Sequence, residues 1–298
     1  MKQLIIAAAA SLFVAACASS APETYTQFRT IEDGGTGPYT ALMVEEPSLE
    51  AHTILRPADL KPFKRSNKLP VLVWGNGACA NSPGEHTKFL SEIASHGFLV
   101  VATGFFPQTD DRYHGPMSTP EQQIQGIDWV FAVNEDKNSP YYHKIDTDNI
   151  ALAGMSCGGL QTIHNAAEPR IRTIMVCNSG LFVDRGTAMP NMPMPWKDDL
   201  QKIHTPVLYM LGGPQDIAYG NGMDDFSRIN HVPAFMANYP VGHAGTYAAE
   251  HGGEFAVVAT AWLKWQLKGD QNAKTLFCGS PCGLSQRNGW SVESKNME

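Results

Sequence analysis

Short apolar runs alternate with helical stretches from residue 71 onward, and this alternation limits the folds open to the chain more than any other feature. The first two runs are residues 71–74 and 98–103, and residues 85–96 between them have helical spacing. Continuous apolar strands joined by helices are typical of a mainly parallel sheet with helices on both faces. The sequence therefore predicts an α/β fold.

The alternation continues along the chain without an evident internal repeat. The 298 residues, 43% of them hydrophobic, are enough to bury one large core. We therefore expect residues 26–298 to form a single domain. Its further predicted strands are residues 150–153, 173–176 and 207–211, and its further predicted helices are residues 119–134, a segment after Ser156 and residues 253–267.

The first residues are typical of a secretory signal. Lys2 supplies a positive start, and residues 4–16 form an apolar run that is too short to cross a bilayer as a helix. We therefore predict a signal peptide over residues 1–16, and we expect the protein to be exported.

Residues 14–17, with the sequence VAAC, resemble the lipobox of bacterial lipoproteins, in which the cysteine becomes the lipidated first residue. Cys17 would then anchor the protein to a membrane, and residues 17–25 would form a flexible tether. This interpretation predicts a periplasmic or outer-membrane-anchored lipoprotein, or one at the cell surface. The alternative is an ordinary signal peptide cut within residues 18–21, which also exports the protein.

The charge distribution argues against a nucleic-acid partner. The formal net charge is −7, and no run of Lys or Arg could follow a phosphate backbone. We therefore expect no nucleic acid to bind.

Ser156 lies at the centre of Gly154-Met155-Ser156-Cys157-Gly158, between a predicted strand and a predicted helix. A nucleophile elbow requires this context, because its turn is so tight that the residues two before and two after the serine must be small. The turn pushes the serine Oγ outward at a helix N-terminus, whose dipole favours developing negative charge. We therefore interpret Ser156 as a nucleophile.

A serine hydroxyl needs a base to take its proton and a carboxylate to orient that base. Asp216 follows the predicted strand at residues 207–211, and His243 lies in a small-residue loop before the last predicted helix. Serine, acid and histidine stand in this order in the α/β hydrolases. We therefore predict that Asp216 and His243 form a triad with Ser156.

Other acids and histidines are weaker candidates for these two roles. Asp224 is the alternative acid because it follows the same strand, and His251 is the alternative base. Asp225 follows that strand too, whereas three histidines are not at the right strand end: His164, His204 and His231. Most of these competing residues are expected to be surface groups.

A serine nucleophile also needs N–H groups that stabilise the oxyanion of the transition state. The N–H of Cys157, directly after the nucleophile, supplies the first. The second is expected from the loop after residues 71–74. We favour the N–H of Ala78, with Gly77 as the alternative.

Export permits disulfides, so the remaining cysteines are candidates for pairing. Cys278 and Cys282 lie close together in a turn-rich tail, and we predict a disulfide between them. Half of a zinc site is the alternative, but no second Cys or His cluster lies near it. We predict no metal and no cofactor.

Cys79, Cys157 and Cys177 form an odd set. One hypothesis is that two of them form a disulfide that ties the oxyanion loop to the nucleophile turn. The other is that all three are small buried hydrophobic side chains.

On these residues the chain resembles the bacterial polyester-hydrolase and cutinase-like branch of the α/β hydrolases, which is related to the dienelactone hydrolases. The resemblance covers most of residues 70–280 and implies one catalytic domain of the α/β-hydrolase fold, with Ser156, Asp216 and His243 as the triad. The similar segments are residues 94–101, 139–147, the elbow, 215–218, 242–243 and 262–264.

Two positions depart from this resemblance, and both concern the substrate. Polyester-cleaving relatives usually carry an aromatic residue after the oxyanion glycine and a Trp before the serine, whereas this chain has Ala78 and Met155. A small soluble ester therefore fits as well as a polymeric one.

The substrate wall is predicted from apolar residues near the strand ends. Residues 187–196 interleave Met with Pro and cannot form a regular helix, so they are interpreted as an apolar wall or partial lid, or else as a surface loop. The predicted wall residues are Met155, Trp74, Phe105, Phe106 and Met192.

These residues predict a two-step hydrolysis of a carboxylic ester through an acyl intermediate on Ser156. A peptidase or acyltransferase using the same triad is the nearest competing enzyme class. Two more distant possibilities are a non-catalytic binding protein on a hydrolase fold and a thiol enzyme with Cys157 as nucleophile.

Overall fold

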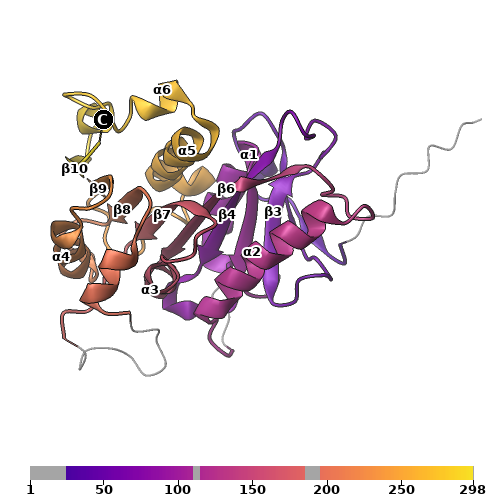
Figure 1. Ribbon diagram of the computed structural model, residues 1–298, viewed down its shortest axis with the longest axis horizontal. Coiled ribbons are helices and arrows are strands. Elements are labelled where there is room, and N and C mark those ends of the chain that lie inside the picture. Colours follow the sequence, from indigo (N-terminus) through magenta and orange to yellow (C-terminus); the bar gives the residue numbers. More distant parts are fainter. Residues whose placement is uncertain (1–24, 110–114, 185–194, 298) are drawn as a thin grey trace, which may run out of the picture.

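The computed structural model describes residues 25–109, 115–184 and 195–297, which contain a ten-stranded sheet with helices on both faces (Figure 1). The strand order is β1-β2-β3-β5-β4-β6-β7-β8-β9-β10. The strands are β1 (Phe28–Arg29), β2 (Ala41–Val44), β3 (His52–Pro57), β4 (Leu69–Gly75), β5 (Leu99–Thr103), β6 (Ile145–Met155), β7 (Ile171–Cys177), β8 (Val207–Leu211), β9 (Ala234–Asn238) and β10 (Ser291–Lys295).

The centre of this sheet is parallel, and both of its edges are antiparallel. Each neighbouring pair from β5 through β4, β6, β7 and β8 to β9 is parallel. By contrast, β1, β2 and β3 continue the sheet beyond β5 in antiparallel order, and β10 pairs antiparallel with β9. The mainly parallel sheet predicted from the apolar runs is therefore confirmed.

Helices cover both faces, which explains why the central strands are apolar on both sides. Buried residues of α1 and α5 belong to the core on one face, and buried residues of α2, α3 and α4 belong to the core on the other. The helices are α1 (Thr87–Ser95), α2 (Pro120–Glu135), α3 (Cys157–His164), α4 (Tyr219–Arg228), α5 (Gly253–Lys268) and α6 (Gln271–Lys274). Short 3-10 helices are η1 (Glu32–Gly34), η2 (Gly77–Cys79), η3 (Gly84–His86), η5 (Lys197–Lys202), η6 (Glu250–Gly252) and η7 (Leu284–Gln286).

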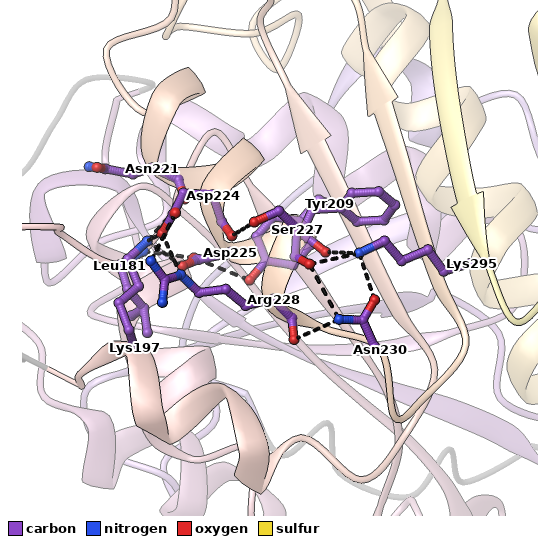
Figure 2. Close-up of polar contacts among 11 residues, drawn as sticks. Leu181, Lys197, Tyr209, Asn221, Asp224, Asp225, Ser227, Arg228, Asn230 and Lys295 are labelled. Atoms are coloured by element: carbon purple, nitrogen blue, oxygen red, sulfur yellow. Dashed lines mark hydrogen bonds and ion pairs between the residues drawn. The ribbon is translucent and has the colours of Figure 1, made fainter.

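The last strand, β10, contacts the C-terminal end of α4. Lys295 on β10 donates from Nζ to the carbonyl oxygen of Ser227 at 3.0 Å and to Oδ1 of Asn230 at 3.1 Å (Figure 2). The same Nζ donates to the carbonyl oxygens of Phe226 and Ile229 at 2.6 and 3.2 Å. Carbonyl groups at a helix C-terminus lack partners within the helix and favour a cation. The ammonium group of Lys295 therefore caps α4.

Several predicted features lie outside the described residues. These are the signal peptide, Cys17, most of the tether and Met192. In the part of the chain that the structure describes, no helix is both long enough and apolar enough to cross a membrane.

Candidate active site

β6 runs directly into α3 through Ser156, whose backbone has φ 52° and ψ −116°. The glycines on either side make this turn feasible. A Cβ on Gly154 would lie 2.3 Å from the carbonyl carbon of Gly158, and a Cβ on Gly158 would lie 2.1 Å from the carbonyl oxygen of Gly75. Strand, turn and helix thus meet at backbone distance, as the predicted elbow requires.

The three residues predicted to form the triad lie in contact. His243 Nε2 is 3.0 Å from Ser156 Oγ, and His243 Nδ1 is 2.6 Å from Asp216 Oδ1. A carboxylate only accepts hydrogen bonds, so Nδ1 of His243 carries the proton. Nε2 is then the acceptor, and the hydroxyl of Ser156 donates to it. Proton transfer from Oγ to Nε2 therefore needs no rearrangement.

Asp216 is held in one orientation by donors on both of its oxygens. Oδ1 also accepts from the N–H of Ala218 at 2.9 Å, while Oδ2 accepts from the N–H of Gly212 at 3.0 Å and from Asn178 Nδ2 at 2.8 Å. Burial raises the pKa of Asp216, but the hydrogen bonds from His243, Gly212, Ala218 and Asn178 outweigh it and keep the pKa below its usual value. The carboxyl is therefore ionised at neutral pH.

The alternative acid and base are occupied elsewhere. Asp224 forms ion pairs with Lys197 and Arg228 (Figure 2). His251 lies 3.5 Å from the carboxylate of Glu32. Neither Asp224 nor His251 lines the pocket that holds Ser156 and His243.

The loop after β4 turns sharply beside the elbow. Ala78 and Cys79 both have left-handed backbones, with φ 53° and 49°. The buried side chain of Asn76 supports this loop, because its Nδ2 donates to the carbonyl oxygens of Ala80 at 2.9 Å and Thr103 at 2.7 Å. The carbonyl of Asn76 also accepts from the N–H of Gly158, at 3.0 Å.

A disulfide joins Cys79 of this loop to Cys157 at the start of α3, with a Cα–Cα distance of 5.1 Å. The hypothesis that two of the three central cysteines tie the loop to the nucleophile turn is therefore confirmed. Cys177, the third, is a buried thiol. Among the described residues, the N–H groups of Ala78 and Cys157 donate to no carbonyl outside their own helices.

The tail cysteines differ from the prediction. Cys278 and Cys282 are two separate thiols, so the predicted disulfide between them is absent from the structure. The tail is closed instead by an antiparallel backbone bridge between Gly279 and Cys282, and Cys282 packs into the core beside α5. Backbone pairing and burial thus hold this turn without a covalent link.

An open pocket of about 70 Å³ lies beside Ser156 and His243. Apolar groups form much of its wall, and Ile217 at its rim is 82% exposed. The lining residues are Ser156, Leu160, Asn178, Ser179, Gly180, Phe182, Ile217, Ala218, Asn221 and His243.

Most of the predicted substrate wall is wrong. Trp74 is fully buried and packs against Phe89 and Tyr247 at ring-centroid distances of 5.2 and 6.1 Å. Its side chain points from β4 into the core beneath α1 and α5, because successive residues of a strand face opposite sides of the sheet. Phe105 and Phe106 line a different surface pocket.

Met155 lies near the site but not in the pocket. It is 7% exposed, and its sulfur would lie 2.6 Å from a Cβ placed on Gly77. Met155 therefore packs behind the loop after β4 and does not line the pocket. The wall residues that sequence reasoning missed include Phe182 and Ile217.

A buried ion pair anchors the segment that carries Phe182. Asp225 on α4 accepts from the N–H of Leu181 at 2.7 Å and from Lys197 Nζ at 2.7 Å, as Figure 2 shows. Asp225 is completely buried and Lys197 is 8% exposed. Burial raises the pKa of Asp225 to about 6, against the opposing effect of Lys197. Leu181, the residue before Phe182, and Lys197 are therefore both bonded to α4, the helix that carries Asn221.

The sheet and the serine elbow define an α/β hydrolase. The chain matches the family model described as PET hydrolase-like over residues 62–293, which is most of its length, and it belongs to this family. It is therefore a hydrolase that acts on esters, and the resemblance to polyester hydrolases is confirmed. No curated protein matches the chain.

Proposed function

We propose that this protein is a serine esterase in which Ser156 is the nucleophile, His243 the general base and Asp216 the residue that orients the base. The observation that carries the proposal is the continuous hydrogen-bonded path from Ser156 Oγ through His243 to Asp216, with distances of 3.0 and 2.6 Å. This path matches the geometry that activates a serine hydroxyl.

In the first step, Ser156 Oγ attacks the ester carbonyl while its proton moves to His243 Nε2. The N–H groups of Cys157 and Ala78 donate to the oxyanion that forms. The protonated His243 then gives its proton to the departing alcohol, which leaves an acyl group on Ser156. In the second step, His243 takes a proton from water while the water oxygen attacks the acyl carbonyl. The protonated His243 then returns this proton to Ser156 Oγ as the acyl–Oγ bond breaks, and the acid is released.

The pocket supports an ester with a small or narrow group at the reacting carbonyl, because the open space beside Ser156 has a volume of about 70 Å³. The rest of the substrate would lie along the rim formed by Phe182 and Ile217. An exposed apolar rim favours apolar substituents. Both a small ester and a chain end of a polymeric ester meet these conditions.

The proposal includes export, with a lipid anchor on Cys17. The support is the VAAC sequence at residues 14–17, together with the disulfide between Cys79 and Cys157. Disulfides persist in oxidising compartments such as the periplasm. This disulfide also argues against a thiol enzyme, because Cys157 has no thiolate to offer while it is bonded to Cys79.

A fluorophosphonate probe tests the assignment on the purified mature protein. The probe is expected to label Ser156, and Ser156→Ala is expected to lose both the label and turnover of a panel of aryl esters of increasing acyl length. Ser285→Ala, in the C-terminal tail, is the matched control and is expected to keep both. Near-normal turnover by Ser156→Ala would refute the assignment, and an inert wild-type protein would favour a binding protein.

A further inference from the structure

Asn178 lies directly behind Asp216, at the carboxyl end of β7. It is completely buried, and its backbone is left-handed with φ 42°, a conformation in which Asn is several-fold enriched among non-glycine residues. Its Nδ2 donates to Asp216 Oδ2 at 2.8 Å and to the carbonyl oxygen of Gly242 at 3.3 Å. Gly242 directly precedes His243. One amide group therefore contacts both the loop of the acid and the loop of the base.

Tyr247 fixes the orientation of this amide. Its hydroxyl donates to Asn178 Oδ1 at 2.6 Å. The direction of these bonds follows from chemistry, because the Asp216 carboxylate and the Gly242 carbonyl only accept hydrogen bonds. The NH₂ group of Asn178 must face them, so its oxygen faces Tyr247, and the hydroxyl of Tyr247 must donate.

The ring of Tyr247 has little freedom to turn away. It is 2% exposed and packs edge-on against Phe89 and Phe255 at ring-centroid distances of 5.1 and 5.4 Å. Burial raises the pKa of Tyr247 well above its usual value, so the hydroxyl keeps its proton throughout the working pH range.

From this geometry we propose that Asn178 and Tyr247 are positioning residues that extend the triad, with Tyr247 orienting Asn178 and Asn178 holding Asp216 and the loop of His243 in register. The inference rests on the proposed esterase function. Asn178 lines the pocket, but neither residue is part of the hydrogen-bonded path from Ser156 Oγ through His243 to Asp216 Oδ1. Their contribution is to keep Asp216 Oδ1 facing His243 Nδ1 while Oδ2 is fully satisfied.

Two substitutions and their combination test this chain of contacts. Tyr247→Phe keeps the ring and removes only the hydroxyl, whereas Asn178→Gly removes the amide and tolerates the left-handed backbone. We expect kcat to fall about fivefold in Tyr247→Phe and about 100-fold in Asn178→Gly, with KM changed by less than about twofold. The double variant should be no slower than Asn178→Gly, because Tyr247 acts through Asn178.

The pH dependence gives a readout that a general loss of stability would not move. Where the Asn178 donor is lost, or is no longer held in place by Tyr247, Asp216 is a stronger acceptor for the proton on His243, so the protonated imidazole is favoured. The acidic limb of kcat/KM should then move to higher pH in both single variants, and NMR titration of the His243 ring should show the same shift without turnover. The matched control is Tyr141→Phe, which removes another buried hydroxyl, one that donates to the carboxylate of Glu46.

Effects that add in the double variant, or an unmoved His243 titration in folded Tyr247→Phe, would overturn the proposal. The Tyr247→Phe result decides the matter even where Asn178→Gly does not fold. Failure of the esterase assignment looks different, since wild-type protein would then take no fluorophosphonate label at Ser156 although the shift of the His243 titration could still be measured.

Discussion

Cys79 and Cys157 are bonded to each other across the gap between the loop after β4 and the first turn of α3. The loop after β4 carries one proposed oxyanion donor, the N–H of Ala78 beside Cys79. The first turn of α3 carries the other, the N–H of Cys157 itself. The distance between the two donors is therefore limited by a covalent bond as well as by packing.

Removing this disulfide should affect both stability and rate. The bond spans 78 residues of sequence, and the double variant Cys79→Ser with Cys157→Ser is expected to lose about 4 kcal/mol of unfolding free energy. Its kcat should fall more than its KM rises, because the donors act on the transition state. Urea unfolding and steady-state kinetics measure the two effects. Dithiothreitol should lower the urea midpoint of the wild-type protein and leave that of the double variant unchanged. Equal urea midpoints for oxidised and reduced wild-type protein would contradict this.

Adding one methyl group at Gly212 should push the loop that carries Asp216 away from the loop that carries His243. A Cβ on Gly212 would lie 1.9 Å from the carbonyl oxygen of Gly242, the residue before His243. Gly212→Ala is therefore expected to displace His243 from Asp216 and to lower kcat/KM by about 100-fold or more. Gly220→Ala in α4 is the matched control, since nothing lies within 4 Å of its Cβ. That variant should keep full activity and gain about 0.5 kcal/mol of stability.

Lys197 is expected to be needed for folding stability because it neutralises Asp225. Lys197→Met leaves the buried carboxylate of Asp225 without a counter-ion and should lower the unfolding free energy by about 3–5 kcal/mol at neutral pH. Replacing both residues, with Lys197→Met and Asp225→Leu, should recover much of this loss. Urea unfolding of the single and double variants measures this. Lys202→Met is the control, because the Lys202 side chain is 59% exposed. A double variant as unstable as the single one would contradict the explanation.

The same pair predicts a pH dependence of stability. The pKa of Asp225 is raised to about 6 in the folded protein, above its value of about 3.9 in an unfolded chain. The folded state therefore binds this proton more tightly, and the contribution of Asp225 to stability falls as pH rises from about 4 to about 6. In Lys197→Met this fall should be larger, which unfolding curves over that pH range would show.

Glu92 should contribute stability in the opposite direction. Burial raises its pKa, but hydrogen bonds from His96 and Thr36 outweigh this and lower the pKa to about 2. A depressed folded pKa gives stability that is present above the unfolded pKa of about 4.5 and is lost as pH falls toward 2, at most about 3 kcal/mol in total. Glu92→Gln should remove this acid-dependent loss, as thermal unfolding against pH would show. Glu293→Gln, at an exposed position on β10, should behave like wild type.

The elements that the sequence predicted well are those with a single strong signal. Residues 207–211 coincide with β8, because a buried parallel strand is apolar throughout and its neighbours are not. The contact of Asp216 and His243 with Ser156 was predictable for a related reason, since Asp216 and His243 each follow a strand in small-residue turns. By contrast, β1 has two residues, which is too short for any periodic pattern to show.

The substrate wall could not be predicted because strand position alone does not say which face a side chain occupies. Trp74 is an aromatic residue at a strand end, as a wall residue would be, yet its side chain faces the core. Asn178 and Tyr247 were missed although a signal existed for the first. Asn178 directly follows an apolar strand and begins Asn178-Ser179-Gly180, and Asn is among the few residues that adopt a left-handed backbone at such a point.

The contact of Lys295 with the end of α4 has a practical consequence for anyone who handles this enzyme. Three carbonyl oxygens and an amide oxygen converge on the ammonium group of Lys295. The helix that this group caps also supplies Asn221 to the pocket. A change at Lys295 is therefore expected to reach Asn221 through α4, and variants of Lys295 should be compared with the unaltered chain before their kinetics are interpreted.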